Sequence, residues 1–246
     1  MALEYKPTND DAPEVSNHYC VFGNPINHSK SPVLHTLFAD QTHQHLTYTS
    51  ECIDVGGFSS AAKDFFSSGG KGLNVTVPFK HDAYIFATSL TARAIRAGAV
   101  NTLFVNKRDV IVGDNTDGIG LVADLKQHLQ WQLNDKKILI LGAGGAVRGI
   151  LEPLIVELPR SITIVNRSRE KAQLLANDFA DIFSVAVTSY PELNNSDDLG
   201  SYDLIINASS ASLSGQLPDL PDHIVDKNSR CYDLMYAKVL TPFLFW

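Results

Sequence analysis

Short apolar runs alternate with segments of helical periodicity along most of this chain of 246 residues. In the first half, the apolar runs predict strands, and apolar residues three and four positions apart predict helices between them. The strands are expected at 19–22, 46–53 and 72–77, the helices at 32–40 and 58–66, and a hairpin at 99–105 and 110–112. Strands that alternate with helices are typical of α/β proteins, so we predict an α/β fold for this half.

A second series of apolar runs begins after Asn134 and Asp135. Its strands are expected at 138–141, 162–165, 203–206 and 230–233. Between the two series, Leu121, Leu125 and Leu129 recur every fourth residue, which predicts a connecting helix over 116–130. We therefore expect two α/β domains that flank a cleft, over 1–116 and 117–237, with 238–246 packed back onto the first domain.

Composition and charge narrow the class of protein. Hydrophobic residues make up 44% of the chain and charged residues 19%, as in ordinary globular proteins. The formal net charge is −7 and no basic run is present, which argues against a nucleic-acid surface or a basic membrane-binding helix. We therefore expect a small-molecule ligand rather than a nucleic acid or a membrane.

The compartment is predicted from the leading segment and the cysteines. Residues 1–17 are polar and acidic without an apolar core, so we interpret them as a disordered lead-in and not as a signal peptide. No apolar stretch has the length that a membrane span needs. Cys20, Cys52 and Cys231 are odd in number and widely separated, which favours reduced thiols in the cytoplasm.

A glycine-rich turn follows the strand predicted at 138–141 and precedes a helix. Gly142 allows a sharp turn, and Gly144 allows backbone N–H groups to approach a pyrophosphate at the helix N-terminus. Small residues at Gly145 and Ala146 permit close helix packing, although Val147 stands where Gly or Ala is usual. The pattern predicts a Rossmann-like dinucleotide site, while a purely structural turn remains the alternative.

The end of the next strand indicates which dinucleotide would bind. An NAD site usually carries Asp or Glu there, whereas this chain reads Asn166, Arg167, Ser168 and Arg169. Guanidinium groups and a hydroxyl suit a 2′-phosphate, so NADP is favoured. In the alternative interpretation, Ser168 caps a helix and the two arginines are solvated.

Candidate chemistry in the first half comes in polar clusters beside predicted strands. Ser29 and Ser31 follow the first strand, and Ser31 has an alternative role as an N-cap with Pro32 as the first helical residue. Asn74 and Thr76 share one side of an extended segment that leads to Lys80, which is otherwise an exposed lysine after a strand. Asn101 and the polar segment 113–118 complete the set, and capping of a helix is the simpler role of that segment.

Seven motifs in this order resemble the shikimate dehydrogenase family. They are HSKSP at 28–32, NVTVPFK at 74–80, AGAVNT at 97–102, GDNTDG at 113–118, LGAGGA at 141–146, NRS at 166–168 and YDLMY at 232–236. The resemblance extends from Tyr19 to Trp246. It implies an oxidoreductase that reduces 3-dehydroshikimate reversibly to shikimate with NADP and without a metal, on the route to chorismate and aromatic amino acids.

The resemblance also implies roles for single residues in a substrate-binding domain and a Rossmann-like domain. Ser29 and Ser31 hold the substrate carboxylate, and Lys80 and Asp117 form the catalytic pair. Further substrate contacts are expected from Asn74, Thr76, Asn101, Asp117 and Tyr236, the last with packing in the cleft as an equal alternative. The pyrophosphate is expected at Gly142, Ala143, Gly144, Gly145 and Ala146. The 2′-phosphate is expected at Asn166, Arg167 and Ser168. Lys171 would assist, with an exposed helix lysine as the alternative interpretation. The nicotinamide side is expected at Asn207 and the loop after it.

The chain ends at Trp246, whereas the sequences of family members normally continue beyond this point. We therefore expect weakened activity, in a monomer or a homodimer. Two other functions stay open: a quinate/shikimate relative that uses NAD, and a binding or regulatory protein that retains affinity without turnover. The first requires an acidic group near Asn166, and the second is opposed by the intact Lys80 and Asp117. A purely structural α/β domain is the least favoured.

Overall fold

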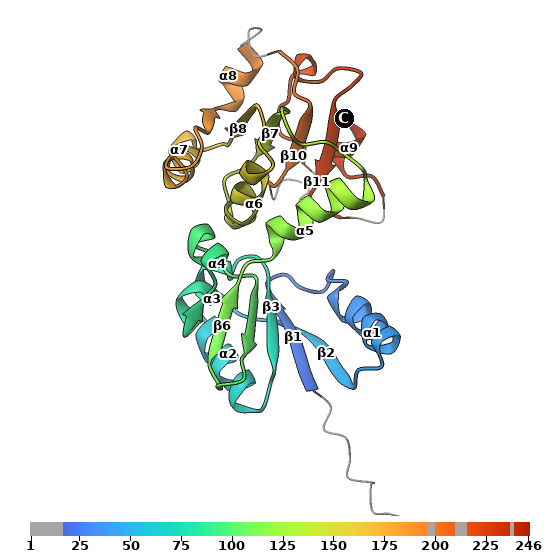
Figure 1. Cartoon of the computed structure of the whole chain (residues 1–246), viewed down its shortest axis with the longest axis vertical. Helices are drawn as coiled ribbons and strands as arrows, with labels where there is room; N and C mark the ends of the chain where they lie inside the picture. Colours follow the sequence, from blue (N-terminus) through green and yellow to red (C-terminus); the bar gives the residue numbers. More distant parts are fainter. Residues whose placement is uncertain (1–16, 196–199, 210–215, 237–238) are drawn as a thin grey trace, which may run out of the picture. The chain divides into compact units, whose positions relative to one another are not determined.

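The computed structural model describes residues 17–195, 200–209, 216–236 and 239–246, which form two compact units (Figure 1). The first unit runs to Leu90 and includes Val100–Asp114, and the second comprises Thr91–Ala99 and Asn115–Trp246. Each unit carries its own sheet and helices, so the predicted two-part α/β fold is confirmed. The helix within 91–99 belongs to the second unit, whereas the sequence assigned it to the first. The predicted disordered lead-in lies outside the described residues, except that Asn17 already begins a strand.

The sheet of the first unit has six strands in the order β2-β1-β3-β5-β6-β4. The strands are β1 (Asn17–Gly23), β2 (Leu46–Cys52), β3 (Gly72–Val75), β4 (Ser89–Leu90), β5 (Thr102–Val105) and β6 (Ile111–Asp114). β1 is parallel to both β2 and β3, while β5 runs antiparallel to β3 and β6. The predicted hairpin is therefore confirmed as β5 and β6.

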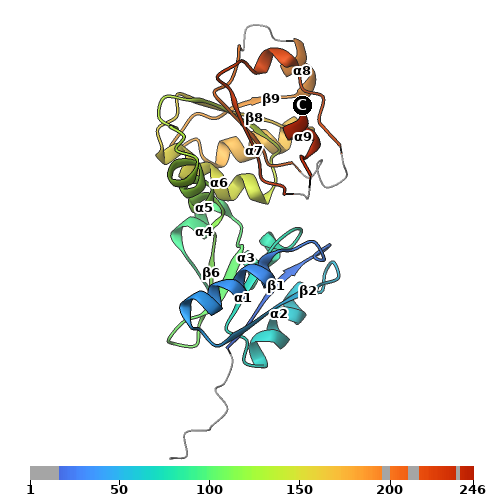
Figure 2. The same ribbon diagram turned by 90° about the vertical axis from the view of Figure 1, so that its right-hand side faces the viewer.

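Helices cover both faces of this first sheet (Figures 1 and 2). They are α1 (Ser31–Thr42), α2 (Phe58–Ser67) and α3 (Lys80–Phe86). Phe58 and Phe65 of α2 meet Phe22 of β1 edge-on, with ring centroids 6.2 and 6.0 Å apart. His35 of α1 stacks instead on Tyr48 of β2. Because alternate residues of a strand face opposite sides, α1 and α2 lie on opposite faces.

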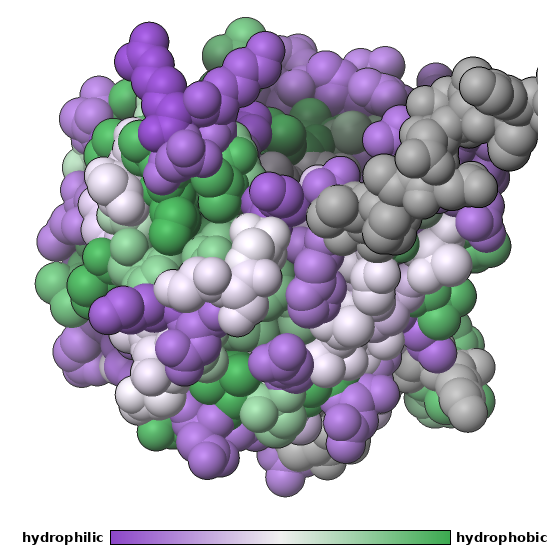
Figure 3. Space-filling view, turned by 90° about the horizontal axis from the view of Figure 1, so that it is seen from below, coloured by the Kyte–Doolittle hydropathy of each residue, from purple (hydrophilic) through white to green (hydrophobic). Residues whose placement is uncertain are grey.

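The outer surface of α1 is unusually apolar. Val33, Leu34, Leu37 and Phe38 are exposed to 61, 46, 52 and 52%. Hydrophobic side chains are also interspersed with hydrophilic ones on the face of the molecule in Figure 3. Scattered apolar residues are normal on protein surfaces, but four on one helix explain why periodicity alone gives α1 no clear inner side.

The second unit is built on five parallel strands in the order β11-β10-β7-β8-β9. The strands are β7 (Lys137–Leu141), β8 (Ser161–Val165), β9 (Ala186–Thr188), β10 (Leu204–Asn207) and β11 (Arg230–Asp233). Its helices are α4 (Ala92–Ala97), α5 (Asp117–Ala123), the π-helix η1 (Asp124–His128), α6 (Gly145–Val156), α7 (Arg169–Asp178), α8 (Tyr190–Asn195), the 3-10 helix η4 (Asp222–Ile224) and α9 (Pro242–Phe245). The chain moves outward from β7 through β8 to β9 and then returns to β10 beside β7, so the topology switches between β7 and β10.

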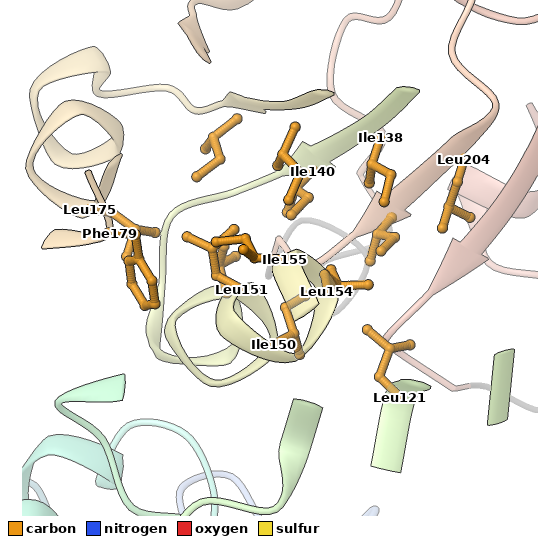
Figure 4. Close-up of a cluster of buried hydrophobic side chains, with 14 of the residues drawn as sticks. Leu121, Ile138, Ile140, Ile150, Leu151, Leu154, Ile155, Leu175, Phe179 and Leu204 are labelled. Atoms are coloured by element: carbon orange, nitrogen blue, oxygen red, sulfur yellow. The ribbon is translucent and has the colours of Figure 1, made fainter. Parts of the chain in front are cut away.

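Alternating residues of β7 supply two hydrophobic cores. Ile138 and Ile140 face the core that contains Leu151 and Leu154 of α6, as Figure 4 shows. Leu139 and Leu141 face the opposite core, which is closed by α8 and α9. All four β7 side chains are fully buried, and each burial stabilises the fold by roughly 1.5–3 kcal/mol.

The connecting helix differs from the predicted helix over 116–130. α5 passes at Asp124 into a π turn, in which an additional residue enters the helical repeat. Leu121 and Leu125 are buried as expected, but Leu129, the residue that ends the π turn, is 40% exposed.

The C-terminal residues belong to the second unit, which corrects the expectation that 238–246 pack onto the first. Phe243 is 1% exposed in the core with Leu139 and Leu141. Thr241 Oγ1 donates to Asp233 Oδ2 at 2.6 Å. Within the described ranges, no helix combines the length and the apolar character needed to cross a bilayer.

Candidate functional site

The motif segments of the first unit meet at one edge of its sheet. β1, β2 and β3 are parallel, so Gly23, Cys52 and Val75 end their strands on the same side. Thr102 at the start of β5 is paired with Asn74 and with the last residue of β6. Polar loops at the carboxyl ends of parallel strands are where α/β proteins bind ligands.

Backbone hydrogen bonds tie two of these loops together. Asn24 N donates to Val77 O at 2.9 Å, and Thr76 N donates to Phe22 O at 2.9 Å. A Cβ at Gly23 would lie 2.5 Å from Cγ2 of Thr76, so only glycine permits this approach. The loop with Ser29 and the loop that leads to Lys80 are therefore held in one arrangement.

Ser29 and Ser31 are both partly buried at the beginning of α1. Ser29 Oγ accepts from the N–H of Ser31 at 3.3 Å. The N-cap of α1 is Lys30 and makes no side-chain capping bond, so the alternative role of Ser31 as N-cap is wrong.

Asn74 and Asn101 are connected through Thr102. Asn74 Nδ2 donates to Thr102 Oγ1 at 3.3 Å, and Thr102 Oγ1 donates to Asn101 Oδ1 at 2.9 Å. The phenol of Tyr48 donates to Asn74 Oδ1 at 2.5 Å. The sequence analysis did not identify Tyr48, because a tyrosine in a strand with alternating burial is normally assigned to the hydrophobic core. The only available signal was the hydroxyl of a side chain expected to be buried, which needs a hydrogen-bond partner.

Lys80 and Asp117 each stand at the first position of a helix. Lys80 begins α3, is partly buried, and its carbonyl accepts from Val100 N at 2.9 Å in the first unit. Asp117 begins α5 in the second unit. Its N–H donates at 3.1 Å to the side chain of Asn115, which is 3% exposed. The N-cap of α5 is Thr116 and makes no side-chain capping bond, so the Asn115 side chain binds the first N–H of the helix from outside the cap position.

The glycine turn lies at the topological switch of the second sheet. Gly142 follows β7 with φ 112°, and a Cβ there would lie 3.1 Å from the carbonyl oxygen of Ala208 at the end of β10. Gly144 is the N-cap of the 12-residue helix α6, and a Cβ on it meets nothing within 4 Å. A helix N-terminus at a switch point fits a pyrophosphate. Ala143, Gly145 and Ala146 complete this turn.

Replacement of Gly142 by alanine is expected to lower the free energy of unfolding by about 1–2 kcal/mol, because a positive φ costs an L-residue about that much. Denaturant unfolding of the apo protein measures it. Gly144→Ala is the control, with an expected change below about 0.5 kcal/mol, since its φ is −93° and the space is open. Equal losses in both variants would contradict the distinct roles of the two glycines.

The segment after β8 combines capping with positive charge. Ser168 is the N-cap of α7, and its hydroxyl accepts from Lys171 N at 3.4 Å, so the capping interpretation is confirmed. Asn166 Nδ2 donates to the Ser168 carbonyl at 2.8 Å. Arg169 forms an ion pair with Glu192 of α8. Arg167 and Lys171 are exposed and have no ion-pair partner among the residues that the structure describes.

These residues fit an adenosine 2′-phosphate. The position directly after β8 carries an amide, Asn166, rather than the carboxylate that would repel a phosphate. Arg167 adds a guanidinium that can pair with phosphate oxygens in a bidentate manner. No cluster of His, Cys, Asp and Glu suited to a metal is present in the described part of the chain.

Asn207 was expected near the nicotinamide, and its side chain is completely buried. Its Nδ2 donates to Asp233 Oδ1 at 3.0 Å, and its Oδ1 accepts from the N–H and the hydroxyl of Ser209 at 3.1 and 2.7 Å. Asn207 thus orders the loop after β10, which was expected to pass near the nicotinamide. Ser210 of that loop lies outside the described residues, and Tyr236 is 58% exposed.

Two family models match this chain. The shikimate dehydrogenase substrate binding domain matches residues 21–103, and shikimate / quinate 5-dehydrogenase matches residues 124–215. A shikimate dehydrogenase (NADP(+)) of Cellvibrio japonicus is 51% identical over 228 residues, which cover 93% of this chain and 81% of that protein.

Solved structures agree with this match. The crystal structure of an Ael1 enzyme from Pseudomonas putida matches with a TM-score of 0.83 and 40% identity. The match covers 94% of this chain and 83% of the Ael1 chain. Shikimate 5-dehydrogenase from Thermus thermophilus, in complex with NADP(H) and shikimate, has a TM-score of 0.79 and 25% identity, with 93% and 82% covered. Since sequence, order of domains and fold agree over nearly the whole chain, it belongs to the shikimate dehydrogenase family.

Proposed function

We propose that this chain catalyses the reversible NADP-dependent reduction of 3-dehydroshikimate to shikimate, on the route to chorismate and aromatic amino acids. The observation that carries the proposal is the gathering of family motifs at one sheet edge, where Asn74, Thr102 and Asn101 belong to one hydrogen-bonded row. The domain that contains this edge, about 1–116, binds substrate, and the domain over about 117–237 binds NADP.

The substrate has one carboxylate and several hydroxyls, and the proposed contacts match both. Ser29 and Ser31 donate hydroxyl hydrogen bonds to the carboxylate. Asn74, Thr76 and Asn101 bind ring hydroxyls, because amides and hydroxyls both donate and accept. Tyr236 is a further proposed substrate contact.

Lys80 and Asp117 are the proposed catalytic pair. NADPH, when bound, supplies a hydride to the carbonyl carbon of 3-dehydroshikimate. Negative charge then grows on the carbonyl oxygen, and the Lys80 ammonium stabilises it and delivers a proton. Asp117 orients the ammonium and the same oxygen, and in the reverse direction the pair accepts the hydroxyl proton.

The proposed cofactor contacts are divided between two loops. Gly142, Ala143, Gly144, Gly145 and Ala146 hold the pyrophosphate, and Asn166, Arg167, Ser168 and Lys171 hold the 2′-phosphate. The loop after Asn207 borders the nicotinamide side. A location in the cytoplasm fits three unpaired cysteines, Cys20, Cys52 and Cys231.

Initial rates of shikimate oxidation with NADP and with NAD test this function through NAD(P)H absorbance. Faster turnover with NADP is expected. Arg167→Ala is expected to raise the KM for NADP by roughly tenfold to a hundredfold, as for loss of a hydrogen bond to a charged group, and to leave the KM for NAD within about twofold.

Arg169→Ala is the matched control, because Arg169 is already paired with Glu192. Its expected effect on the KM for NADP is below about threefold. Equal effects of the two arginine variants would contradict the assignment of Arg167. Preference for NAD would support the quinate/shikimate alternative, and binding of NADP and shikimate without turnover would support the binding-protein alternative.

A further inference from the structure

We propose that Tyr48 is a positioning residue of the substrate site, whose hydroxyl holds Asn74 and, through Thr102, Asn101 in their binding orientations. This inference rests on the proposed function and extends it, since the family motifs do not include Tyr48. Its basis is the row of hydrogen bonds that crosses the first sheet at its ligand-binding edge.

Tyr48 reaches its partner across an intervening strand. β1 lies between β2 and β3, with Tyr19 opposite Tyr48 on one side and Val21 opposite Asn74 on the other. Strands two apart in a sheet are separated by roughly 9–10 Å, so only a long side chain spans the gap. The Tyr48 ring covers this distance over Val21, with which it shares a small core.

The hydrogen bonds of the row all run in one direction. Tyr48 donates to Asn74 Oδ1, Asn74 Nδ2 donates to Thr102 Oγ1, and Thr102 donates to Asn101 Oδ1. Each amide therefore has a defined orientation, with Nδ2 of Asn101 turned away from Thr102. An amide without such a partner has two orientations of similar energy, and substrate binding must then select one.

The phenol of Tyr48 is the first donor of the row, and the proposed hydroxyl contacts Asn74 and Asn101 follow it. Burial raises the pKa of Tyr48 above its usual value, and its side chain is only 8% exposed. The phenol consequently keeps its proton, and remains a donor, throughout the neutral range.

The ring itself is held in place from α1. His35 stacks on it with centroids 4.1 Å apart and planes at 2°. α1 begins with Ser31, so the helix that stacks on the ring also carries a proposed carboxylate contact. On its other side, Tyr48 lines a hollow of about 230 Å³ together with Asn74 and Thr102.

Packing alone does not require a hydroxyl at this position. A phenylalanine would fill the same core and keep the stacking with His35, so Tyr48→Phe removes only the hydroxyl. Tyr19→Phe is the matched control, because Tyr19 lies opposite Tyr48 and lines the same hollow. Its phenol has no hydrogen-bond partner within the described ranges.

We expect Tyr48→Phe to raise the KM for shikimate by about five- to tenfold, as for loss of neutral hydrogen bonds in a binding site. The KM for NADP and kcat are expected to stay within about twofold, and Tm within about 2 °C. Tyr19→Phe is expected to change none of these by more than about twofold. In an Asn74→Ala background, the effect of Tyr48→Phe on the shikimate KM is expected to shrink below about twofold, because the shared bond is already lost.

An unchanged shikimate KM in Tyr48→Phe would overturn the inference, and so would an equal rise in the KM for NADP or full additivity with Asn74→Ala. If the unaltered protein binds shikimate without oxidising it, the proposed function fails. Calorimetric Kd values for shikimate then replace KM and are expected to show the same pattern. Absence of shikimate binding by the unaltered protein would overturn both proposals.

Discussion

Replacement of Lys80 by alanine is expected to lower kcat for shikimate oxidation by about 10²–10⁴, which is the usual contribution of a positioned acid or base. The variant has no ammonium to stabilise the developing oxyanion or to exchange its proton. The KM for NADP is expected to remain within about threefold, because Lys80 lies in the proposed substrate domain. Steady-state rates with both substrates varied measure this separation.

Lys71→Ala is the control for this prediction. Lys71 is an exposed lysine directly before β3 of the same unit, and its loss is expected to change kcat by less than about twofold. A folded Lys80→Ala protein that retains kcat within about tenfold would exclude Lys80 as the catalytic acid.

Replacement of Gly118 by valine is expected to lower the free energy of unfolding by about 2–4 kcal/mol. A Cβ on Gly118 would lie 2.4 Å from the carbonyl oxygen of Gly149 and 2.5 Å from Cγ of Pro153. The first of these atoms is backbone, so α5 can accommodate a side chain only by moving away from α6. Urea denaturation of the apo protein measures the loss.

Gly120→Ala on the same helix is the matched control, since a Cβ there meets nothing within 4 Å. Alanine is a better helix former than glycine, and this variant is expected to gain about 0.5–1 kcal/mol. Similar stabilities of Gly118→Val and Gly120→Ala would show that the close packing of α5 on α6 does not account for Gly118.

Most of the fold was predictable because its signals are local. The strands of both sheets except β4 and β9 follow from apolar runs, and the turn at Gly142 follows from a conformation that only glycine adopts readily. Helix 116–130 was predicted at the right place, but its second half is a π turn. A π turn is an insertion into the repeat, and no periodicity in Leu121, Leu125 and Leu129 reveals it.

The residues of the candidate site were predictable as a set, but the structural role of each residue was not. The sequence placed Ser31, Asn74 and Asn101 together through their motifs, whereas Tyr48, which is hydrogen-bonded to Asn74, carries no motif. Asn207 was predicted near the nicotinamide, and the structure adds that its buried amide is held by Asp233 and Ser209.

By itself, the sequence determined the α/β class, the two units, the glycine turn and the preference for a 2′-phosphate, because each depends on neighbours within a few residues. Only the tertiary structure decided that Phe243 packs beneath β7 and that Tyr48 meets Asn74 over a third strand. Such contacts join residues far apart in the chain. Such contacts depend on which apolar surface of a sheet other elements leave uncovered, and on which side chain is long enough to reach across a neighbouring strand. A local sequence pattern encodes neither of these properties.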